Sequence, residues 1–243
     1  MAGDQPTPKE LIHFFEFVRS GIGKTEKTAM KITRFGNEKS NIVLIQLVDE
    51  RELSSMEHEV DLIRGLTDRD FGLIAVCVDD WNKDLSPWQA PSVYGNEDFG
   101  SGADETLSWV LNNVIFGANA EEGDKRRYIL GGYSLAGLFA LYSAYKTNVF
   151  ERIAAASPSV WFPGFTEYAK ENEINADYIY LSLGDKEEKT KNRTLASVGN
   201  CIRELAEYYD TVTDVTLEWN EGNHFADPEV RMAKGFAYLI NRN

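Results

Sequence analysis

The stretch that most constrains this chain is a predicted strand, tight turn and helix over residues 127–142, which read RYILGGYSLAGLFALY. The apolar residues before Ser134 predict a buried strand, and those after it have the pattern of a helix. Small residues flank Ser134, as in a nucleophile elbow, where a sharp turn lifts a serine hydroxyl to the carboxyl edge of a sheet. Ala136 stands where the usual G-x-S-x-G motif has its second glycine. The alternative is that Ser134 merely caps the helix, because serine is a favoured N-cap residue.

From residue 41 onward predicted strands alternate with predicted helices, which is typical of a mainly parallel sheet with helices on both faces. A length of 243 residues, 43% of them hydrophobic, fits one large domain, so we expect a single α/β domain over residues 1–243. The eight predicted strands are residues 11–18, 28–35, 42–48, 71–78, 127–131, 150–157, 177–183 and 212–219. The predicted helices are residues 53–66, 103–117, 135–145, 165–172, 194–209 and 227–240.

The charge and cysteine content exclude several classes of partner. The formal net charge is −14, from 39 acidic and 25 basic residues, so nucleic acid and anionic membrane surfaces are not expected to bind. Cys77 and Cys201 fall within strand and helix patterns and are interpreted as core residues, in keeping with a reducing cytoplasm. Residues 1–10 are polar and no apolar run approaches the length of a membrane span, so neither a signal peptide nor a membrane anchor is expected.

A serine nucleophile needs a base within hydrogen-bond reach, and the chain has only three histidines. His13 precedes the parallel strands, and His58 lies in a predicted helix without the second histidine that a metalloprotease helix requires. His224 directly follows the last predicted strand. Since loops at the carboxyl ends of parallel strands share one crevice, His224 is expected to meet Ser134 and to act as the base. The alternative is an exposed turn histidine beside Gly222. We expect neither a metal nor a cofactor.

The third group of a triad should be a carboxylate that holds the imidazole in the correct tautomer. The loop after the predicted strand 177–183 offers Asp185, Glu187 and Glu188. Glu187 is the first choice because it lies three residues beyond Gly184, far enough round the turn to point back toward the histidine loop. Asp185 is the alternative acid. The chain order of serine, acid and histidine is that of the α/β-hydrolase fold.

Three motifs together resemble the esterase family of α/β hydrolases that includes S-formylglutathione hydrolases, siderophore esterases, feruloyl esterases and mycolyltransferases. The resemblance covers residues 41–240 and implies ester hydrolysis with Ser134 as nucleophile, His224 as base and Glu187 as acid. The joint presence of the three motifs is far more specific than any one motif alone. The motifs are GYSLAGLFALY at 132–142, ASPSVW at 156–161 and GNHF at 222–225.

The chain departs from this family after the predicted strand 42–48, which ends QLVDE instead of in the usual His-Gly. This loop matters because an oxyanion hole needs two donors aimed at the carbonyl oxygen. The amide of Leu135, at the start of the helix after the nucleophile, is one predicted donor. The second is expected from the backbone of Asp49 or Glu50.

Substrate contacts are predicted from loop length and aromatic content. Residues 157–177 are too few for a lid, so we expect a fairly open site and no separate lid domain. The long loop 82–102 is expected to wall the site. Aromatic side chains near this edge could stack on a substrate or only pack against one another. They are Trp81, Trp88, Tyr94, Trp161 and Phe162.

These features predict a cytoplasmic serine esterase that forms an acyl-enzyme on Ser134, takes a small-molecule ester and uses water as the final acceptor. Two alternatives remain. The acyl group could pass to an alcohol or thiol, which would make the protein an acyltransferase with the same triad. The fold could also be a non-catalytic binding module. The sequence does not predict an oligomeric state.

Overall fold

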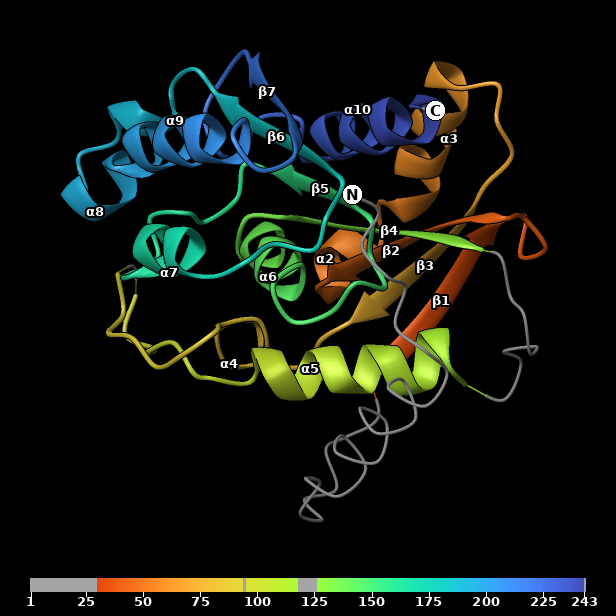
Figure 1. The fold of residues 1–243 in the computed structure, drawn as a ribbon, viewed down its shortest axis with the longest axis horizontal. Helices are drawn as coiled ribbons and strands as arrows, with labels where there is room; N and C mark the ends of the chain where they lie inside the picture. The colour runs from red at the N-terminus through yellow and green to blue at the C-terminus, as the bar shows by residue number, and fades with distance from the viewer. Residues whose placement is uncertain (1–29, 94, 118–125, 243) are drawn as a thin grey trace, which may run out of the picture.

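A seven-stranded mixed sheet runs through the residues that the computed structural model describes, which are 30–93, 95–117 and 126–242 (Figure 1). The strand order is β1-β3-β2-β4-β5-β6-β7. The strands are β1 (Lys31–Gly36), β2 (Ile42–Val48), β3 (Gly72–Cys77), β4 (Arg127–Tyr133), β5 (Arg152–Ala156), β6 (Tyr178–Gly184) and β7 (Asp214–Asn220).

The prediction of a mainly parallel eight-stranded sheet is corrected in number and direction. The six strands β2 to β7 are parallel, whereas β1 pairs antiparallel with β3, with Lys31 opposite Cys77 and Gly36 opposite Gly72. The predicted strand 28–35 corresponds to β1, which joins the sheet as an edge strand. Its expected hairpin partner, residues 11–18, lies outside the described residues, as do His13 and Tyr94.

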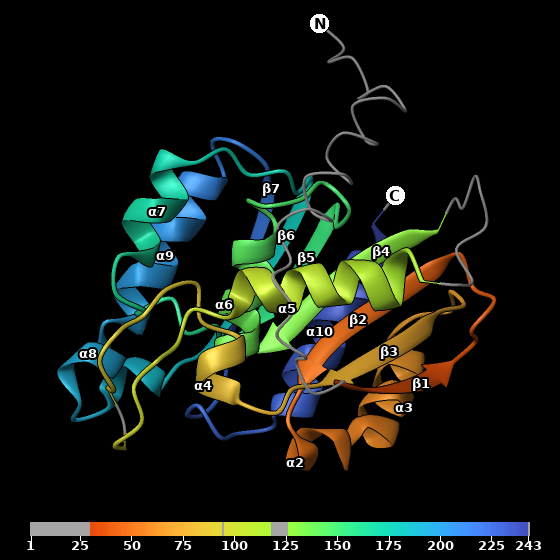
Figure 2. The same ribbon diagram turned by 90° about the horizontal axis from the view of Figure 1, so that it is seen from below.

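Helices cover both faces of the sheet, as predicted. Figure 2 shows α5, α6, α7 and α9 in front of the strands and α3 and α10 behind them. The two faces carry separate apolar clusters. The longer helices are α3 (Met56–Leu66), α5 (Ala103–Val110), α6 (Leu135–Ser143), α7 (Phe165–Glu171), α9 (Val198–Tyr209) and α10 (Pro228–Asn241). The short helices are α2 (Glu50–Leu53), α4 (Trp81–Asp84), α8 (Arg193–Ala196) and the 3₁₀ turn η2 (Glu187–Lys189).

Two helices differ from the simple pattern that the sequence predicts. The expected helix 103–117 widens into a π-helix, η1 (Leu111–Ile115), after α5. Helix α6 is apolar on all sides, and every residue from Leu135 to Ser143 is buried, because it lies between the sheet and α5 and α7. None of the described helices is both long and apolar enough to cross a membrane.

Close packing of α10 on the sheet brings its first turns to the carboxyl edge. Gly131 of β4 lies against α10, and a Cβ built there would be 2.5 Å from the Phe236 ring. A larger residue at Gly131 would therefore push the helix away. Complete burial of Phe236 contributes roughly 2–3 kcal/mol to this packing.

The carboxyl ends of β2, β4, β6 and β7 lie at one edge of the sheet because these strands run parallel. Asp49 follows β2 and Ser134 follows β4, while Glu187 and His224 lie in the loops after β6 and β7. The fold therefore brings together residues that are up to 175 positions apart, from 49 to 224.

Candidate active site

Ser134 sits in a strained turn between β4 and α6. Its φ of 57° and ψ of −120° fall where residues other than glycine are rarely found. Hydrogen bonds hold the turn, because the Ser134 amide donates to the Ala156 carbonyl (3.1 Å) and the Ser134 carbonyl accepts from the Ser159 amide (3.0 Å). The strain and its supports match the elbow predicted from the sequence.

Glycine is required at position 132, two residues before the serine. A Cβ on Gly132 would lie 2.4 Å from the carbonyl carbon of Ala136. Ala136 is fully buried next to Gly132. Its methyl group fits there because Gly132 has no side chain. The replacement of the usual second glycine by alanine therefore leaves the elbow intact.

A continuous hydrogen-bond chain links the three residues predicted for the triad. His224 Nε2 lies 3.0 Å from Ser134 Oγ, and His224 Nδ1 lies 2.7 Å from Glu187 Oε2. The His224 side chain is 33% exposed and the Glu187 side chain 4% exposed. The histidine can therefore reach a bound substrate, whereas the carboxylate is shielded from water.

Glu187 is held as a carboxylate by its donors. Its Oε1 accepts hydrogen bonds from the Gly184 amide (2.7 Å), Ser157 Oγ (2.7 Å) and Arg231 Nη1 (2.8 Å). Burial raises the pKa of Glu187, but the bonds from His224, Gly184 and Ser157 outweigh burial and leave its pKa below the ordinary value. The ionised carboxylate can only accept, so Nδ1 of His224 carries the proton and Nε2 is free to accept one from Ser134.

Asp185, the alternative acid, has a different partner. Its Oδ1 accepts a hydrogen bond from the Gly222 amide (2.8 Å), and the residue is exposed. Asp185 therefore ties the loop after β6 to the loop that carries His224. The geometry favours Glu187 over Asp185 as the partner of the imidazole.

Arg231 of α10 is the main site residue that the sequence did not reveal. It is 1% exposed and donates to Glu187 Oε1 (2.8 Å), Ser157 Oγ (2.9 Å) and Tyr133 Oη (3.1 Å) through Nη1. Through Nη2 it also donates to the carbonyls of Glu221 (3.2 Å) and Asn223 (2.9 Å) in the histidine loop. One guanidinium thus binds both the acid and the loop that presents the base.

Tyr133, the residue before the serine, was also not singled out by the sequence. Its hydroxyl donates to the main-chain carbonyl of His224 (2.8 Å), and its ring centroid lies 5.3 Å from the imidazole. Burial raises the pKa of Tyr133 to about 12, so the phenol keeps its proton and remains a donor. Tyr133 therefore fixes the position of the histidine backbone.

The two predicted oxyanion donors differ in availability. Leu135 is the first residue of α6, and the first amides of a helix have no intrahelical partner. Asp49 caps α2 in a capping box, in which its amide donates to Glu52 Oε2 (3.2 Å) and its side chain accepts from the Glu52 amide (2.6 Å). The Asp49 amide is therefore engaged, whereas Glu50 begins α2 and its amide has no intrahelical partner.

A pocket of about 560 Å³ opens beside Ser134 and His224. Trp81 lines it, but the other two tryptophans predicted to contact substrate do not. Trp88 packs on Phe162 (5.8 Å) and donates to the Pro163 carbonyl (2.9 Å), while Trp161 packs on Phe99 (5.9 Å). These aromatic contacts stabilise the loop 82–102 against the segment after β5.

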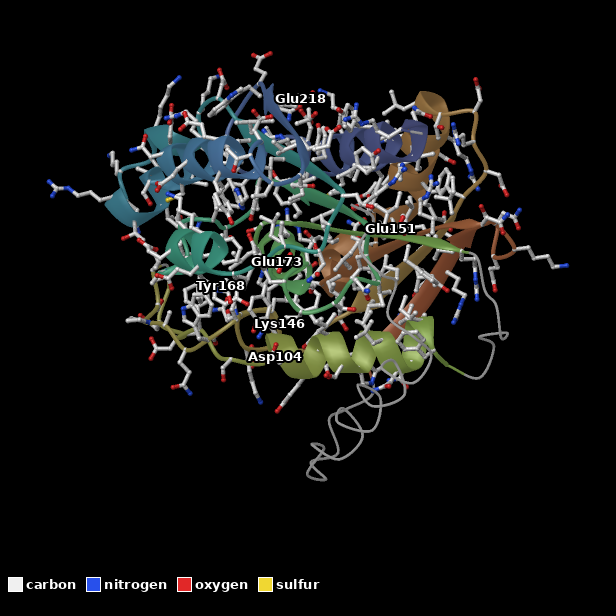
Figure 3. All side chains as sticks on the ribbon, in the orientation of Figure 1. Asp104, Lys146, Glu151, Tyr168, Glu173 and Glu218 are labelled. Atoms are coloured by element: carbon white, nitrogen blue, oxygen red, sulfur yellow. The ribbon has the colours of Figure 1, made fainter. Side chains whose placement is uncertain are left out.

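The aromatic cluster around Trp88 continues away from the pocket. The Trp88 ring lies 5.4 Å from that of Tyr168, which lies 5.6 Å from that of Tyr142. Figure 3 labels Tyr168, Asp104 and Lys146, which gather where α5, α6 and α7 meet. Asp104 accepts a hydrogen bond from Tyr142 Oη (2.9 Å) and pairs with Lys146 (3.6 Å).

Potential metal ligands do not converge within the described part of the chain. No group of three or more His, Cys, Asp or Glu residues there is arranged to hold a metal ion. His58 is exposed on α3. Cys77 and Cys201 are both free thiols.

Solved structures similar to this one include serine hydrolases and esterases, which agrees with the resemblance in the sequence motifs. No family model and no curated protein matches the chain. An IroE-like serine hydrolase from Shewanella oneidensis has a TM-score of 0.70 at 13% identity, covering 86% of this chain and 75% of that one. The siderophore hydrolase EstA from Aspergillus nidulans has a TM-score of 0.65 at 18% identity, covering 91% and 98%.

The enterobactin esterase FES from Shigella flexneri is a third similar structure, with a TM-score of 0.58 at 15% identity. It is matched over 86% of this chain but only 55% of its own length. At such low identities the similarity is one of fold. The chain therefore has an α/β-hydrolase-like fold, with a seven-stranded sheet that is mixed.

Proposed function

We propose that this protein is a serine hydrolase that cleaves carboxylic esters through an acyl-enzyme on Ser134. One observation carries the proposal. The hydroxyl of Ser134, a residue with strained backbone directly after β4, lies 3.0 Å from Nε2 of His224, and Nδ1 of His224 lies 2.7 Å from the buried carboxylate of Glu187. The groups needed to activate a hydroxyl are thus already in contact.

In the acylation step, Ser134 Oγ attacks the ester carbonyl as His224 Nε2 takes the hydroxyl proton. The resulting imidazolium is stabilised by Glu187, whose depressed pKa keeps it ionised. His224 then gives the proton to the leaving alcohol as the C–O bond breaks. The serine is left acylated, and the alcohol departs.

In the deacylation step, a water molecule takes the place of the alcohol and attacks the acyl carbon as His224 removes its proton. The bond between the acyl carbon and Ser134 Oγ then breaks, His224 returns the proton to Oγ, and the carboxylic acid is released. Both steps place negative charge on the carbonyl oxygen, for which the amide of Leu135 is the first proposed donor. Glu50 or Asp49 is the proposed second donor. Asp49 can serve only if its amide exchanges its bond to Glu52 for one to the oxyanion.

The functions of similar proteins support ester cleavage, since two of the similar structures are a siderophore hydrolase and an enterobactin esterase. We expect a small-molecule ester as substrate, because the pocket of about 560 Å³ lies within the range of small-ligand sites. The free thiols Cys77 and Cys201 fit the reducing cytoplasm that we propose as its location.

Hydrolysis of p-nitrophenyl acetate tests the proposal. The Ser134→Ala variant is expected to lose activity by about 10⁴-fold or more, since the nucleophile is removed. Ser159→Ala is the control, because it removes the neighbouring hydroxyl, 3.4 Å from Ser134 Oγ, and leaves Ser134 in place. Full activity in Ser134→Ala would refute the proposed nucleophile, whereas no hydrolysis of any ester by the unaltered protein would leave a binding module as the better description.

A further inference from the structure

The pocket beside Ser134 carries carboxyl groups that the proposed reaction does not use. Asp49, Glu52, Glu59, Asp227 and Glu229 all line it. Among the described residues that line it, Arg51 is the one arginine, and there is no lysine. With a net charge of −14 for the whole chain, this pocket favours a cationic ligand over an anionic one.

Two of the lining side chains have buried acceptors with no partner. Glu59 of α3 is 3% exposed and Gln46 of β2 is 2% exposed, and Gln46 Nε2 donates to Glu59 Oε2 at 3.4 Å. Within the described residues, Glu59 Oε1 and Gln46 Oε1 accept no hydrogen bond. A buried acceptor without a donor is destabilising, so this wall of the pocket is suited to a ligand that brings N–H donors.

The carboxyl groups interact with one another across the pocket. The pKa of Glu59 is raised to about 8 and that of Glu52 to about 7, mainly by burial and with a smaller contribution from the charge of Glu229. A cation bound among these groups favours their ionised form and so opposes the effects that raise their pKa values. Among the described residues, no group of three or more His, Cys, Asp or Glu side chains is arranged to hold a metal ion.

Aromatic side chains complete the pocket. Trp81 and Phe225 line it, and Phe225 is 83% exposed although it directly follows His224. An exposed phenylalanine at the rim offers a ring face, and ring faces attract ammonium groups. The same rings can cover the alkyl chain that carries the charge.

We propose that this acidic pocket is a subsite for an ammonium group of the ester substrate, carried on its acyl or its alcohol part. The inference rests on the proposed esterase function, because it places the ammonium group within reach of an ester bound at Ser134. Glu59, Gln46 and Glu229 are the specificity-determining residues. Esters with a carboxylate in the corresponding position are disfavoured by the same charges.

Matched ester pairs test the subsite through activity. On the acyl side the pair is p-nitrophenyl 6-aminohexanoate and p-nitrophenyl heptanoate, in which an ammonium replaces a methyl group. On the alcohol side the pair is 4-aminobutyl butyrate and pentyl butyrate. In at least one pair kcat/KM is expected to favour the ammonium ester by about tenfold or more, the size of one charge-assisted hydrogen bond.

The variants Glu59→Gln and Glu229→Gln are each expected to reduce this preference several-fold. Glu57→Gln is the matched control, because Glu57 lies on the same helix as Glu59, carries the same charge and is exposed outside the pocket. If Glu57→Gln and Glu59→Gln show the same preference for the ammonium ester, the effect is one of general charge and the subsite is overturned. Hydrolysis of the neutral esters with no preference for the ammonium esters would also overturn the subsite.

A binding measurement keeps this test separate from the proposed activity. Hexylammonium is expected to bind the Ser134→Ala protein by calorimetry, about tenfold or more tightly than 1-hexanol, and the added change Glu59→Gln is expected to remove the difference. If no ester is hydrolysed but hexylammonium still binds in this way, the pocket stands and the esterase function fails. Equal binding of amine and alcohol would overturn the subsite.

Discussion

Replacement of Arg231 by methionine tests whether a buried guanidinium holds the acid and the histidine loop together. The Arg231 side chain is 2% exposed and pairs with Glu187, whose side chain is 4% exposed. It also donates to Tyr133, to Ser157 and to two carbonyls of the loop that carries His224. Methionine is unbranched and fills much of the same space, so the change removes mainly hydrogen bonds and charge.

The expected cost is worked from these contacts. Each hydrogen bond contributes about 1 kcal/mol net, and removal of one partner of a buried ion pair costs about 3–5 kcal/mol because the other charge is left behind. Glu187 keeps its bonds to Gly184, Ser157 and His224, which limits that cost. We therefore expect the free energy of unfolding to fall by about 3–5 kcal/mol.

Urea unfolding measures this loss, and Arg203→Met provides the control. Arg203 pairs with Glu188, next to Glu187, at 2.6 Å, but the two side chains are 42% and 32% exposed. An exposed pair of this kind contributes under about 1 kcal/mol. A loss of under about 1 kcal/mol in both variants, with ester hydrolysis unchanged in Arg231→Met, would refute the role assigned to Arg231.

Further variants test the acid, the pocket and the elbow. Glu187→Gln is expected to lower kcat roughly a thousandfold or more, whereas Asp185→Asn keeps its hydrogen-bond acceptor and most of the activity; equal losses in p-nitrophenyl acetate assays would contradict the choice of acid. Glu59 keeps its proton to about pH 8 in the folded state but loses it near pH 4 when unfolded, so folding stability falls as the pH rises between these values. Glu59→Gln is thus expected to stabilise the protein more at about pH 8 than at about pH 5, and the two effects should differ by an amount on the order of a few kcal/mol. If the Tm difference between this variant and the unaltered protein does not change with pH, the buried carboxyl of Glu59 does not cause a pH-dependent loss of stability. Gly132→Ala places a Cβ 2.4 Å from the backbone of the next helix and is expected to cost about 2 kcal/mol or more in stability, whereas Gly65→Ala, with nothing within 4 Å, is expected to raise the Tm slightly.

The parts of the site that were predictable from the sequence depend on local patterns and on parallel strands. The elbow at Ser134 is specified within a few residues, by an apolar strand, small flanking residues and a helix. His224 and Glu187 each follow a strand end, and parallel strands bring such ends together. The choice between Glu187 and Asp185 needed the structure, because the loop geometry decides which carboxylate turns toward the imidazole.

The parts that were not predicted depend on contacts between distant elements. The position of β1 is set by antiparallel pairing with β3, and no local pattern specifies a partner strand. Arg231 lies on α10 in line with the buried Gly235 and Leu239, and Glu59 lies on α3 in line with the buried Ile63. A charged residue on the apolar face of a helix was the available signal, because it indicates a buried partner or a site.

Mapping of a covalent adduct tests whether Ser134 is the nucleophile. The protein is treated with a fluorophosphonate, digested and analysed by tandem mass spectrometry, with Ser134→Ala and Glu187→Gln treated alongside. We expect a single modification on Ser134, absent from Ser134→Ala and much slower to form in Glu187→Gln. Labelling of another serine, or no labelling of a folded protein that hydrolyses esters, would contradict it.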